Sequence, residues 1–398
     1  MVAVSLLELI PNRITRARPH RRTLIFSLDG ERQAILTPSS KAWYPAPEQR
    51  VANNAKMQAS EESGGQTSRF AVGASRPDPA AGRRAARGPT MTHRFDDDSY
   101  RDLHPSLESQ FTALLARHKE AAGKNEWSYH QFLPLGTSEA NERSPLSPTA
   151  YLAVETALLT EVNLPWYTAG LSRGLESCPG PIQEFVRVWT SEEDQHATLL
   201  ESYLLFTGSG DLSARGRSRK AMIAAGWTHS LGGPFEGMVY TAIQEAATRT
   251  FYLCAARACG EEHPPLAAAL RRIAKDETLH MAFYRDVVKA HLDLDANYLR
   301  PLAAVMLRFE MPWSASVLRD FEERRAILAA RGVFRLSDYL DEVVQPLWSY
   351  WGLDDRKPRR EETRKAYVQL RRYRAALRKF ATGERDSAQR LRELPGES

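Results

Sequence analysis

Two pairs of residues in this sequence have the types and spacing needed to bind a metal ion. Glu193 and His196 are three residues apart, and so are Glu277 and His280. On an α-helix, residues three apart lie on one face about one turn from each other, so both side chains of a pair can reach the same ion. A single pair of this kind arises often by chance on a solvated helix face. It needs support from the rest of the chain.

The spacing of two further glutamates supplies that support. Glu161 precedes Glu193 by 32 residues, and Glu245 precedes Glu277 by the same 32 residues, so the two halves are offset by 84 residues. This offset indicates a duplicated helical hairpin. With a loop near the midpoint, each helix travels about 16 residues, or roughly 24 Å, to or from the loop. Both glutamates of one half then face the same point of a bundle core.

The duplicated spacing predicts a di-iron carboxylate site in a four-helix bundle. Such a site takes one glutamate from each of two helices and a Glu-x-x-His pair from each of the other two. Four carboxylates and two imidazoles nearly balance two ferrous ions, and burying them without a partner in stretches as apolar as ALLTEVNLPWY would be very unfavourable. Oxygen and imidazole ligands suit iron or manganese. The predicted ligands of the two Fe ions are Glu161, Glu193, His196, Glu245, Glu277 and His280.

An acid precedes the metal-binding glutamate in each Glu-x-x-His pair. Histidine ligands usually donate their second ring N–H to a carboxylate or a carbonyl. We expect Asp276 to orient His196 and Glu192 to orient His280, a cross-pairing that preserves the twofold relation of the halves. The alternative is that both acids are exposed helix charges.

The elements that must position these residues are all predicted to be helices, which gives an all-α fold with a ferritin-like four-helix bundle and additional helices. Their boundaries carry helix-breaking punctuation such as SCPGP at 177–181 and HSLGGP at 229–234. The predicted helices are Leu103–Ala121, Pro148–Arg173, Pro181–Thr207, Ser213–Gly226, Pro234–Gly260, Pro264–Ala290, Ala296–Phe309, Ser314–Gly332 and Leu336–Trp351.

Composition divides the chain into three parts. Residues 1–95 are polar, Arg-rich and without helical period, which is typical of a disordered extension. A true start at Met91 and a targeting peptide are the alternatives, and a short hairpin about Asp29 and Gly30 is the one structured element we expect there. Residues 96–355 form the helical domain. Residues 356–398 form a basic, partly helical tail, either a solvated amphipathic helix or a docking surface for an acidic partner.

Charge, cysteine content and hydropathy exclude several classes of protein. Of the net charge of +5, about +7 falls in residues 1–90, so the rest of the chain is close to neutral and nucleic-acid binding gets little support beyond the tails. Three cysteines in 398 residues form no disulfide framework and point to a reducing compartment, which we take as cytoplasmic. No apolar run approaches the roughly 18 residues of a membrane span.

Beyond these ligands, the segments around Glu161, Glu193, Glu245 and Glu277, together with EWSYHQFLP at 126–134, resemble the soluble acyl-[acyl-carrier-protein] desaturases. The similarity runs from about residue 100 to residue 355. It implies a homodimeric, di-iron, O2-dependent oxidoreductase of unsaturated fatty acid biosynthesis. Such an enzyme introduces a cis double bond into a saturated acyl chain carried on acyl carrier protein, with two electrons from ferredoxin.

The resemblance also implies roles for residues outside the ligand set. Thr248 would assist oxygen activation, and Trp127, His196 and Asp276 would carry electrons from the surface to the metals. The residues implied along the acyl channel are Tyr167, Leu171, Met311 and Pro312. Two arginines of the family pattern are Gln195 and Leu279 here, which affects the expected electron-entry surface and leaves the ligands intact.

Other functions remain open at this level. A di-iron oxygenase that hydroxylates a carrier-bound substrate would need the same ligands. A ferritin-like protein that binds iron or acyl carrier protein without turnover is a non-catalytic alternative. Chain length and double-bond position are not encoded in the ligand pattern. Tyr167, Leu171, Thr248 and Phe251 could line an acyl slot between the first and third bundle helices, although plain core packing explains the two aromatic residues equally well.

Overall fold

The structure, a computed structural model, describes residues 100–133, 145–227, 232–312 and 320–393, with side chains as far as residue 386. Within these residues the chain forms helices and no β-strand, which confirms the all-α prediction. The predicted extension 1–95, with its expected hairpin and its alternative start at Met91, lies outside the described residues.

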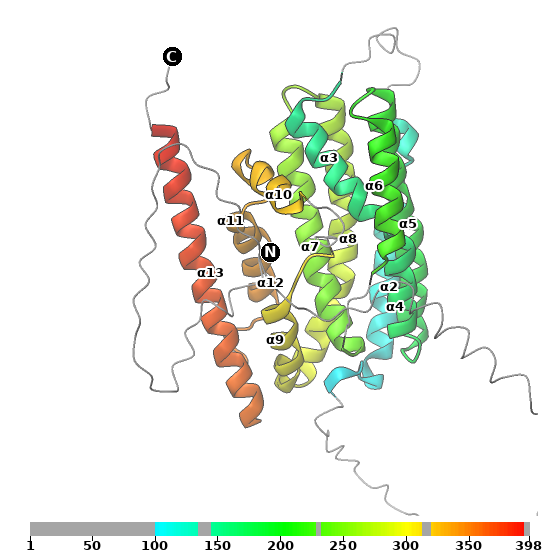
Figure 1. The fold of residues 1–398 in the computed structure, drawn as a ribbon. Coiled ribbons are helices and arrows are strands. Elements are labelled where there is room, and N and C mark those ends of the chain that lie inside the picture. Colours follow the sequence, from blue (N-terminus) through cyan, green and yellow to red (C-terminus); the bar gives the residue numbers. More distant parts are fainter. Residues whose placement is uncertain (1–99, 134–144, 228–231, 313–319, 394–398) are drawn as a thin grey trace, which may run out of the picture. The chain divides into compact units, whose positions relative to one another are not determined.

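Four helices form the bundle that the duplicated spacing predicts. They are α3 (Pro148–Glu161), α5 (Gly180–Phe206), α7 (Pro234–Cys259) and α8 (Pro264–Leu294). Both α3 and α8 pack against α5 and against α7, so the four helices enclose one core (Figure 1). The loop between α7 and α8 falls at residues 260–263, midway between Glu245 and Glu277, as the hairpin prediction requires.

The predicted helix Pro148–Arg173 is interrupted, and in this respect the prediction is wrong. The chain forms α3 up to Glu161 and then a separate helix α4 (Leu164–Gly174), which packs against α5. Pro165 explains the break, because its ring lacks an N–H and collides with the carbonyl of the residue four before it, Glu161. Glu161 therefore ends its helix, and α4 begins three residues later.

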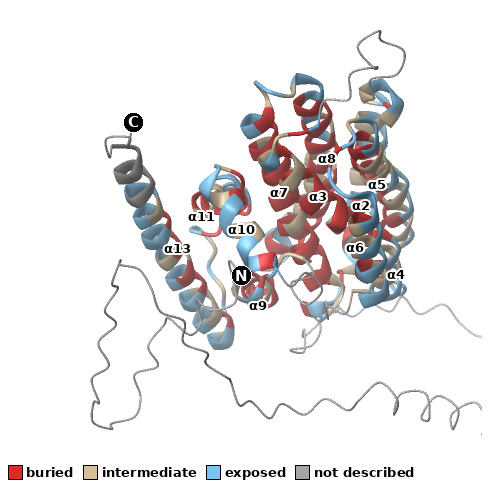
Figure 2. Cartoon of the chain, turned by 45° about the horizontal axis from the view of Figure 1, so that its top comes forward, coloured by how far each residue is buried: buried red, intermediate tan, exposed pale blue. Residues whose placement is uncertain are grey.

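The core of the bundle centres on α7. This helix is buried along nearly its whole length, as the red ribbon of Figure 2 shows, and it carries the apolar and small residues that such a position demands. Around it, α5 and α8 are amphipathic and bury one face each. Phe185 of α5 stacks on Phe283 of α8, and both rings are buried. Phe283 lies one turn after the predicted ligand His280.

Further helices cover the bundle. Of these, α2 lies against α5 and α8, and α9 lies against α7. The additional described elements are η2 (Pro105–Leu107), α2 (Glu108–Gly123), η3 (Tyr129–Phe132), α6 (Leu212–Ala225), η5 (Ala296–Tyr298), α9 (Leu299–Arg308), α10 (Phe321–Ala330), α11 (Leu336–Tyr339), η6 (Leu340–Val344) and α12 (Gln345–Tyr350).

Two of the predicted helices differ from the observed ones in the last third of the chain. The helix expected from Ser314 begins at Phe321, and residues 313–319 lie outside the described part. The helix expected at Leu336–Trp351 contains a π-helical turn, η6, in which the Gln345 N–H bonds the Leu340 carbonyl. Pro346 accounts for the wider turn, because it has no N–H with which to continue the α-helical ladder.

The basic tail forms the long helix α13 (Glu361–Glu393). It is amphipathic, as predicted, and buries Leu370, Tyr373 and Leu377 while it packs along α9 and α11. It belongs to the same compact unit as the bundle. Whether its basic outer face binds an acidic partner stays a prediction.

Among the described helices, none combines the length and the apolar character that crossing a lipid bilayer requires.

The stacked pair Phe185–Phe283 gives a test of this core. We expect Phe283→Ala to lower the free energy of unfolding by about 3–5 kcal/mol, because it opens a cavity between α5 and α8 that the bundle cannot fill. Urea denaturation followed by circular dichroism measures this change. Phe380→Ala is the matched control, since that ring is 41% exposed and its loss should have little effect. Equal destabilisation by both substitutions would contradict the described packing.

Candidate metal centre

The six predicted ligands converge in the middle of the bundle. Their potential ligand atoms form two groups, and within each group these atoms lie within 4.8 Å of one another. One group is Glu161, Glu193, His196 and Glu277; the other is Glu193, Glu245, Glu277 and His280. Glu193 and Glu277 belong to both groups, so they lie between the two positions. Each position thus has one imidazole and three carboxylates, two of which are shared.

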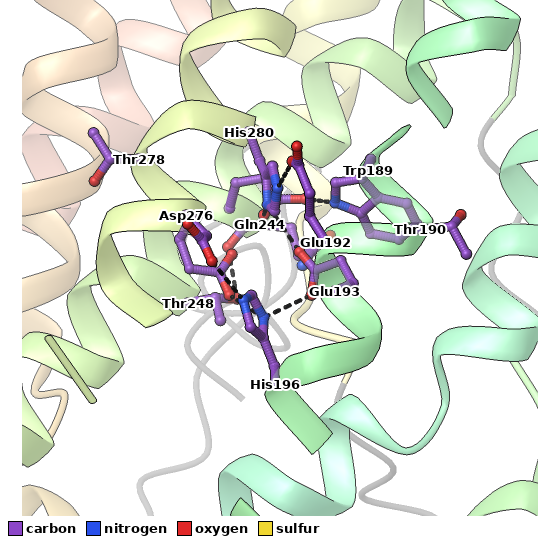
Figure 3. A network of polar contacts seen from close by, with 12 residues as sticks. Trp189, Thr190, Glu192, Glu193, His196, Gln244, Thr248, Asp276, Thr278 and His280 are labelled. Carbon is purple, nitrogen blue, oxygen red and sulfur yellow. Dashed lines mark hydrogen bonds and ion pairs between the residues drawn. The ribbon is translucent and has the colours of Figure 1, made fainter. Parts of the chain in front are cut away.

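Helix geometry explains the convergence. In each Glu-x-x-His pair both side chains leave the same face of the helix, and Figure 3 shows Glu193 and His196 of α5 directed toward Asp276 and His280 of α8. Glu161 ends α3, and Glu245 lies near the middle of α7, which is buried along nearly its whole length. All six side chains are buried, with Glu161 the most exposed at 8%.

The protein alone does not satisfy these buried polar groups. Both carboxylate oxygens of Glu277, the Oε2 atom of Glu245 and the Nδ1 atom of His280 have no hydrogen-bond partner. Native proteins leave few buried polar atoms without a partner, so such a cluster of them needs an explanation. Hard oxygen and imidazole donors grouped in this way fit divalent iron or manganese, and this donor set is consistent with a metal site.

Electrostatics divide the carboxylates into two kinds. Burial, together with the negative charge of Glu193, raises the pKa of Glu161 to about 8 and that of Glu245 to about 7. Burial and the neighbouring carboxylates also raise the pKa of Glu277 well above its usual value. Burial acts in the same direction on Glu193, but the charge of His196 outweighs it and lowers the Glu193 pKa. Without metal, the cluster therefore retains protons that a cation would displace.

The histidines respond to the same charges. Burial by itself would lower the pKa of His196, but the charge of Glu193 and the hydrogen bond to Asp276 raise it to about 10. The pKa of His280 is likewise raised well above its usual value against the effect of burial, by its hydrogen bond to Glu192 and by the negative charge of the nearby Glu193.

The predicted cross-pairing of acids and histidines is confirmed. His196 Nε2 lies 3.4 Å from Asp276 Oδ2, and His280 Nε2 lies 2.8 Å from Glu192 Oε2 (Figure 3). In both histidines the Nδ1 atom faces the ligand cluster instead: His196 Nδ1 is 3.0 Å from Glu193 Oε2, and His280 Nδ1 is 2.9 Å from Glu193 Oε1. Each imidazole thus turns one nitrogen to the cluster and the other to an orienting carboxylate.

The residues expected on the electron path also lie together. The Trp127 indole N–H donates to Asp276 Oδ2 over 2.6 Å, and the Trp127 and His196 rings are stacked 6.4 Å apart. Arg272 forms an ion pair with Asp276, and its guanidinium lies 5.4 Å from the centre of the Trp127 ring. Trp127, Arg272 and Gln195 line one surface cleft. Arg272 thus provides a cation in the cleft that Gln195, one of the two replaced arginine positions of the family pattern, also lines.

The residues expected around the substrate fall into two places. Thr248, Phe251 and Met311 line a small cavity beside Glu161, whose volume of about 20 Å³ suffices for about one water molecule. The Thr248 hydroxyl donates to the Gln244 carbonyl.

Two other expected substrate contacts, Tyr167 and Pro312, touch each other and do not line this cavity. The Tyr167 hydroxyl donates to the Pro312 carbonyl over 3.3 Å, and its ring packs edge-on against Trp227. Leu171, one turn further along α4, is buried and does not line the cavity. The structure therefore brings Tyr167 to Pro312 and Thr248 to Met311, and leaves Leu171 apart from that cavity.

Several side chains at the centre were not identified from the sequence. The Tyr252 hydroxyl donates to Glu161 Oε1 over 2.5 Å, and the Trp189 indole N–H donates to Glu245 Oε1 over 3.1 Å. Tyr252 is seven residues after Glu245 and Trp189 is four before Glu193, so both lie on ligand-bearing helix faces. That spacing could have identified them. His118 of α2 donates to Glu192, which with His280 lowers the pKa of Glu192 to about 2 against the effect of burial.

The fold and the centre define a ferritin-like helical-bundle protein with a buried carboxylate and histidine cluster. Residues 101–395 match the sequence profile of the fatty acid desaturase family, and the chain belongs to this family. DesA1 of Mycobacterium tuberculosis, provisionally named an acyl-[acyl-carrier-protein] desaturase, is 29% identical over 277 residues, which cover 64% of this chain and 78% of DesA1.

Two plant relatives are similarly distant. The chloroplastic palmitoyl-[acyl-carrier-protein] 4-desaturase of Coriandrum sativum is 27% identical, over 63% of this chain and 71% of the relative. The chloroplastic stearoyl-[acyl-carrier-protein] 9-desaturase of Simmondsia chinensis is 28% identical, over 58% and 63%. The names of these two relatives state different acyl chains and different double-bond positions, although both are almost equally identical to this chain.

The raised pKa values predict how pH changes the stability of the metal-free protein. Glu161, Glu245 and His196 each bind a proton more tightly in the folded state than in the unfolded state. The free energy of unfolding should therefore fall as the pH rises from about 6 to about 8.5. The slope is up to about 1.4 kcal/mol per pH unit for each proton that unfolding releases. Adding ferrous iron without oxygen should reverse the trend, because metal binding displaces the same protons and strengthens as the pH rises. Thermal unfolding at both pH values, with and without metal, measures this. A metal-free protein that gains stability over this range would contradict the assignment.

Removal of one carboxylate tests the ligand set. In Glu245→Ala we expect bound iron to fall from about two ions per chain to one or fewer, while helical content is retained. Iron quantitation after anaerobic reconstitution, with far-ultraviolet circular dichroism, checks both. Glu262→Ala removes an exposed glutamate in the loop between α7 and α8 and serves as the control. Full iron binding by Glu245→Ala would exclude Glu245 as a ligand.

Proposed function

We propose that the protein is an acyl-[acyl-carrier-protein] desaturase that introduces a cis double bond into a carrier-bound saturated acyl chain. The observation that carries the proposal is the paired ligand cluster, in which Glu193 and Glu277 lie between two positions that each have one histidine. Membership of the fatty acid desaturase family and the carrier-bound substrates in the relatives' names support the same reaction.

The proposed cofactor is a pair of iron ions held by the six buried ligands. When bound, these ions supply the reduction of O2 and the removal of hydrogen from unactivated C–H bonds, chemistry that carboxylate and imidazole side chains lack. The protein's own part is to hold the ligands in place, position the chain and exclude water. The burial of every ligand and the apolar residues along α7 suit this task.

Substrate contacts are proposed for Tyr167, Leu171, Met311 and Pro312, with Thr248 beside the cluster. The cavity beside Glu161 brings Met311 and the Thr248 hydroxyl to the edge of the cluster, where a small molecule such as O2 or one end of an acyl segment could approach. Tyr167 and Pro312 are joined by a hydrogen bond and would form part of the wall of an acyl slot. Leu171, buried on α4, would contribute to that wall only if the slot extends along this helix.

Electrons are proposed to enter at the surface cleft of Trp127. From there the contacts run from the indole N–H to Asp276 over 2.6 Å and from Asp276 to His196 over 3.4 Å. The proposed partners are acyl carrier protein, a ferredoxin or similar donor with its reductase, and a second copy of the chain in a homodimer. All three follow from the family and not from contacts in this structure.

Reconstitution tests the reaction. With ferrous iron, ferredoxin, its reductase, O2 and carrier proteins bearing different acyl chains, we expect a product that lacks two hydrogens, detected by mass spectrometry after release of the acyl group. A product that has gained an oxygen atom would replace desaturation by hydroxylation. Absence of turnover in protein that carries its full iron would overturn the enzymatic function. Fragmentation of the product locates the double bond, which the relatives' differing names leave open.

A further inference from the structure

The carboxylates that orient the two histidines of the centre, Asp276 and Glu192, accept hydrogen bonds from different residues. On one side, the carboxylate of Asp276 accepts from the Trp127 indole and pairs with Arg272. On the other side, the carboxylate of Glu192 accepts from a third imidazole, His118 of α2, over 3.0 Å. The duplicated halves of the bundle are therefore completed by unlike residues from outside it.

His118 is held in one orientation by its surroundings. Its side chain is 3% exposed, and its ring meets Phe185 edge-on at 4.9 Å and lies 5.9 Å from the ring of His280. Its Nδ1 atom is buried and has no hydrogen-bond partner. An unpaired buried N–H is less favourable than an unpaired ring lone pair, so the proton belongs on Nε2, the atom that faces Glu192.

This tautomer has a consequence for His280. Glu192 Oε2 lies within hydrogen-bond distance of both His118 Nε2 and His280 Nε2, and a carboxylate can accept from both N–H groups. With its proton on Nε2, His280 turns the lone pair of Nδ1 toward Glu193 and Glu245, at 2.9 and 3.8 Å. The Glu192 side chain is 24% exposed and lines the surface cleft, so without a second donor it has room to turn outward.

We infer that His118 is a positioning residue, which fixes Glu192 and through it presents the Nδ1 atom of His280 to one of the two metal positions. This inference rests on the proposed function only in that the cluster binds metal. His118 is not one of the six predicted ligands, and its contacts lie on the side of Glu192 and His280. Its effect should therefore fall on one metal position and leave the position of His196 unchanged.

A metal titration tests the inference with cobalt(II) alone as the probe. The full chain, free of metal, is titrated with cobalt(II). Visible absorption reports how much cobalt is bound, and proton NMR records the imidazole N–H signals that the bound cobalt shifts. We expect His118→Phe, which keeps an aromatic ring but has no donor, to weaken one of two cobalt equivalents by about 10-fold or more. The N–H signal of His280 should exchange faster with water. His118→Gln, whose amide can reach Glu192, should restore most of the affinity and the signal.

Two further variants separate positioning from packing. Trp127→Phe removes the corresponding donor on the other side and should weaken the other cobalt equivalent. In a double-mutant cycle, His118→Phe should add little to the loss caused by Glu192→Gln, because His118 acts through Glu192. If His118→Phe does not fold, His118→Gln replaces it in the cycle with Glu192→Gln. We then expect His118→Gln to bind cobalt with near-normal affinity.

Several outcomes would overturn the inference. These are unchanged binding in His118→Phe, equal loss at both metal positions, His118→Gln as defective as His118→Phe, or additive losses in the cycle. Failure of the proposed function is distinguishable. Wild-type protein that binds two cobalt ions but forms no desaturated product would contradict the reaction and leave the role of His118 intact, whereas wild-type protein that binds no cobalt would overturn both.

Discussion

The structure depends on the burial of four carboxylates and two imidazoles in one apolar core. A single charged carboxylate in such surroundings would be very unfavourable, and the pKa values of Glu161 and Glu245, raised to about 8 and about 7, express that strain. Mutual contact with the histidines relieves part of it, since Glu193 is held ionised by His196. The bundle can keep this cluster only because α7 is buried on nearly every side and the four helices hold one another in place.

Residues outside the four-helix bundle complete the centre. Trp127 precedes the short helix η3, and His118 belongs to α2, which lies across α5 and α8. Each donates to the carboxylate that orients one histidine. The predicted ligands thus repeat between the two halves of the bundle, whereas the residues that hold the orienting carboxylates differ between them. The indole side carries Arg272, whereas the imidazole of His118 is almost wholly buried. Asp276 and Glu192 both line the surface cleft, so the two sides differ in the groups that hold the carboxylate and not in their closeness to the surface.

Membership of the fatty acid desaturase family agrees with a centre of this kind, but the relatives divide over where along the chain they act. The named 4-desaturase and 9-desaturase are 27% and 28% identical to this chain. Overall identity therefore carries no information on double-bond position.

The sequence by itself was enough to predict the six residues that converge in the core, the hairpin repeat and the cross-pairing of Asp276 and Glu192, because the fixed rise and turn of an α-helix convert spacing into faces and heights. It also contained the signal for the break after Glu161, in Pro165, which the helix prediction passed over. Only the tertiary structure decided which side chains of other helices contact the clustered glutamates and Glu192. Tyr252 and Glu161 are 91 residues apart, Trp189 and Glu245 are 56 apart, and His118 and Glu192 are 74 apart. Such contacts depend on how each helix is rotated about its axis, and that rotation is set by packing against neighbours.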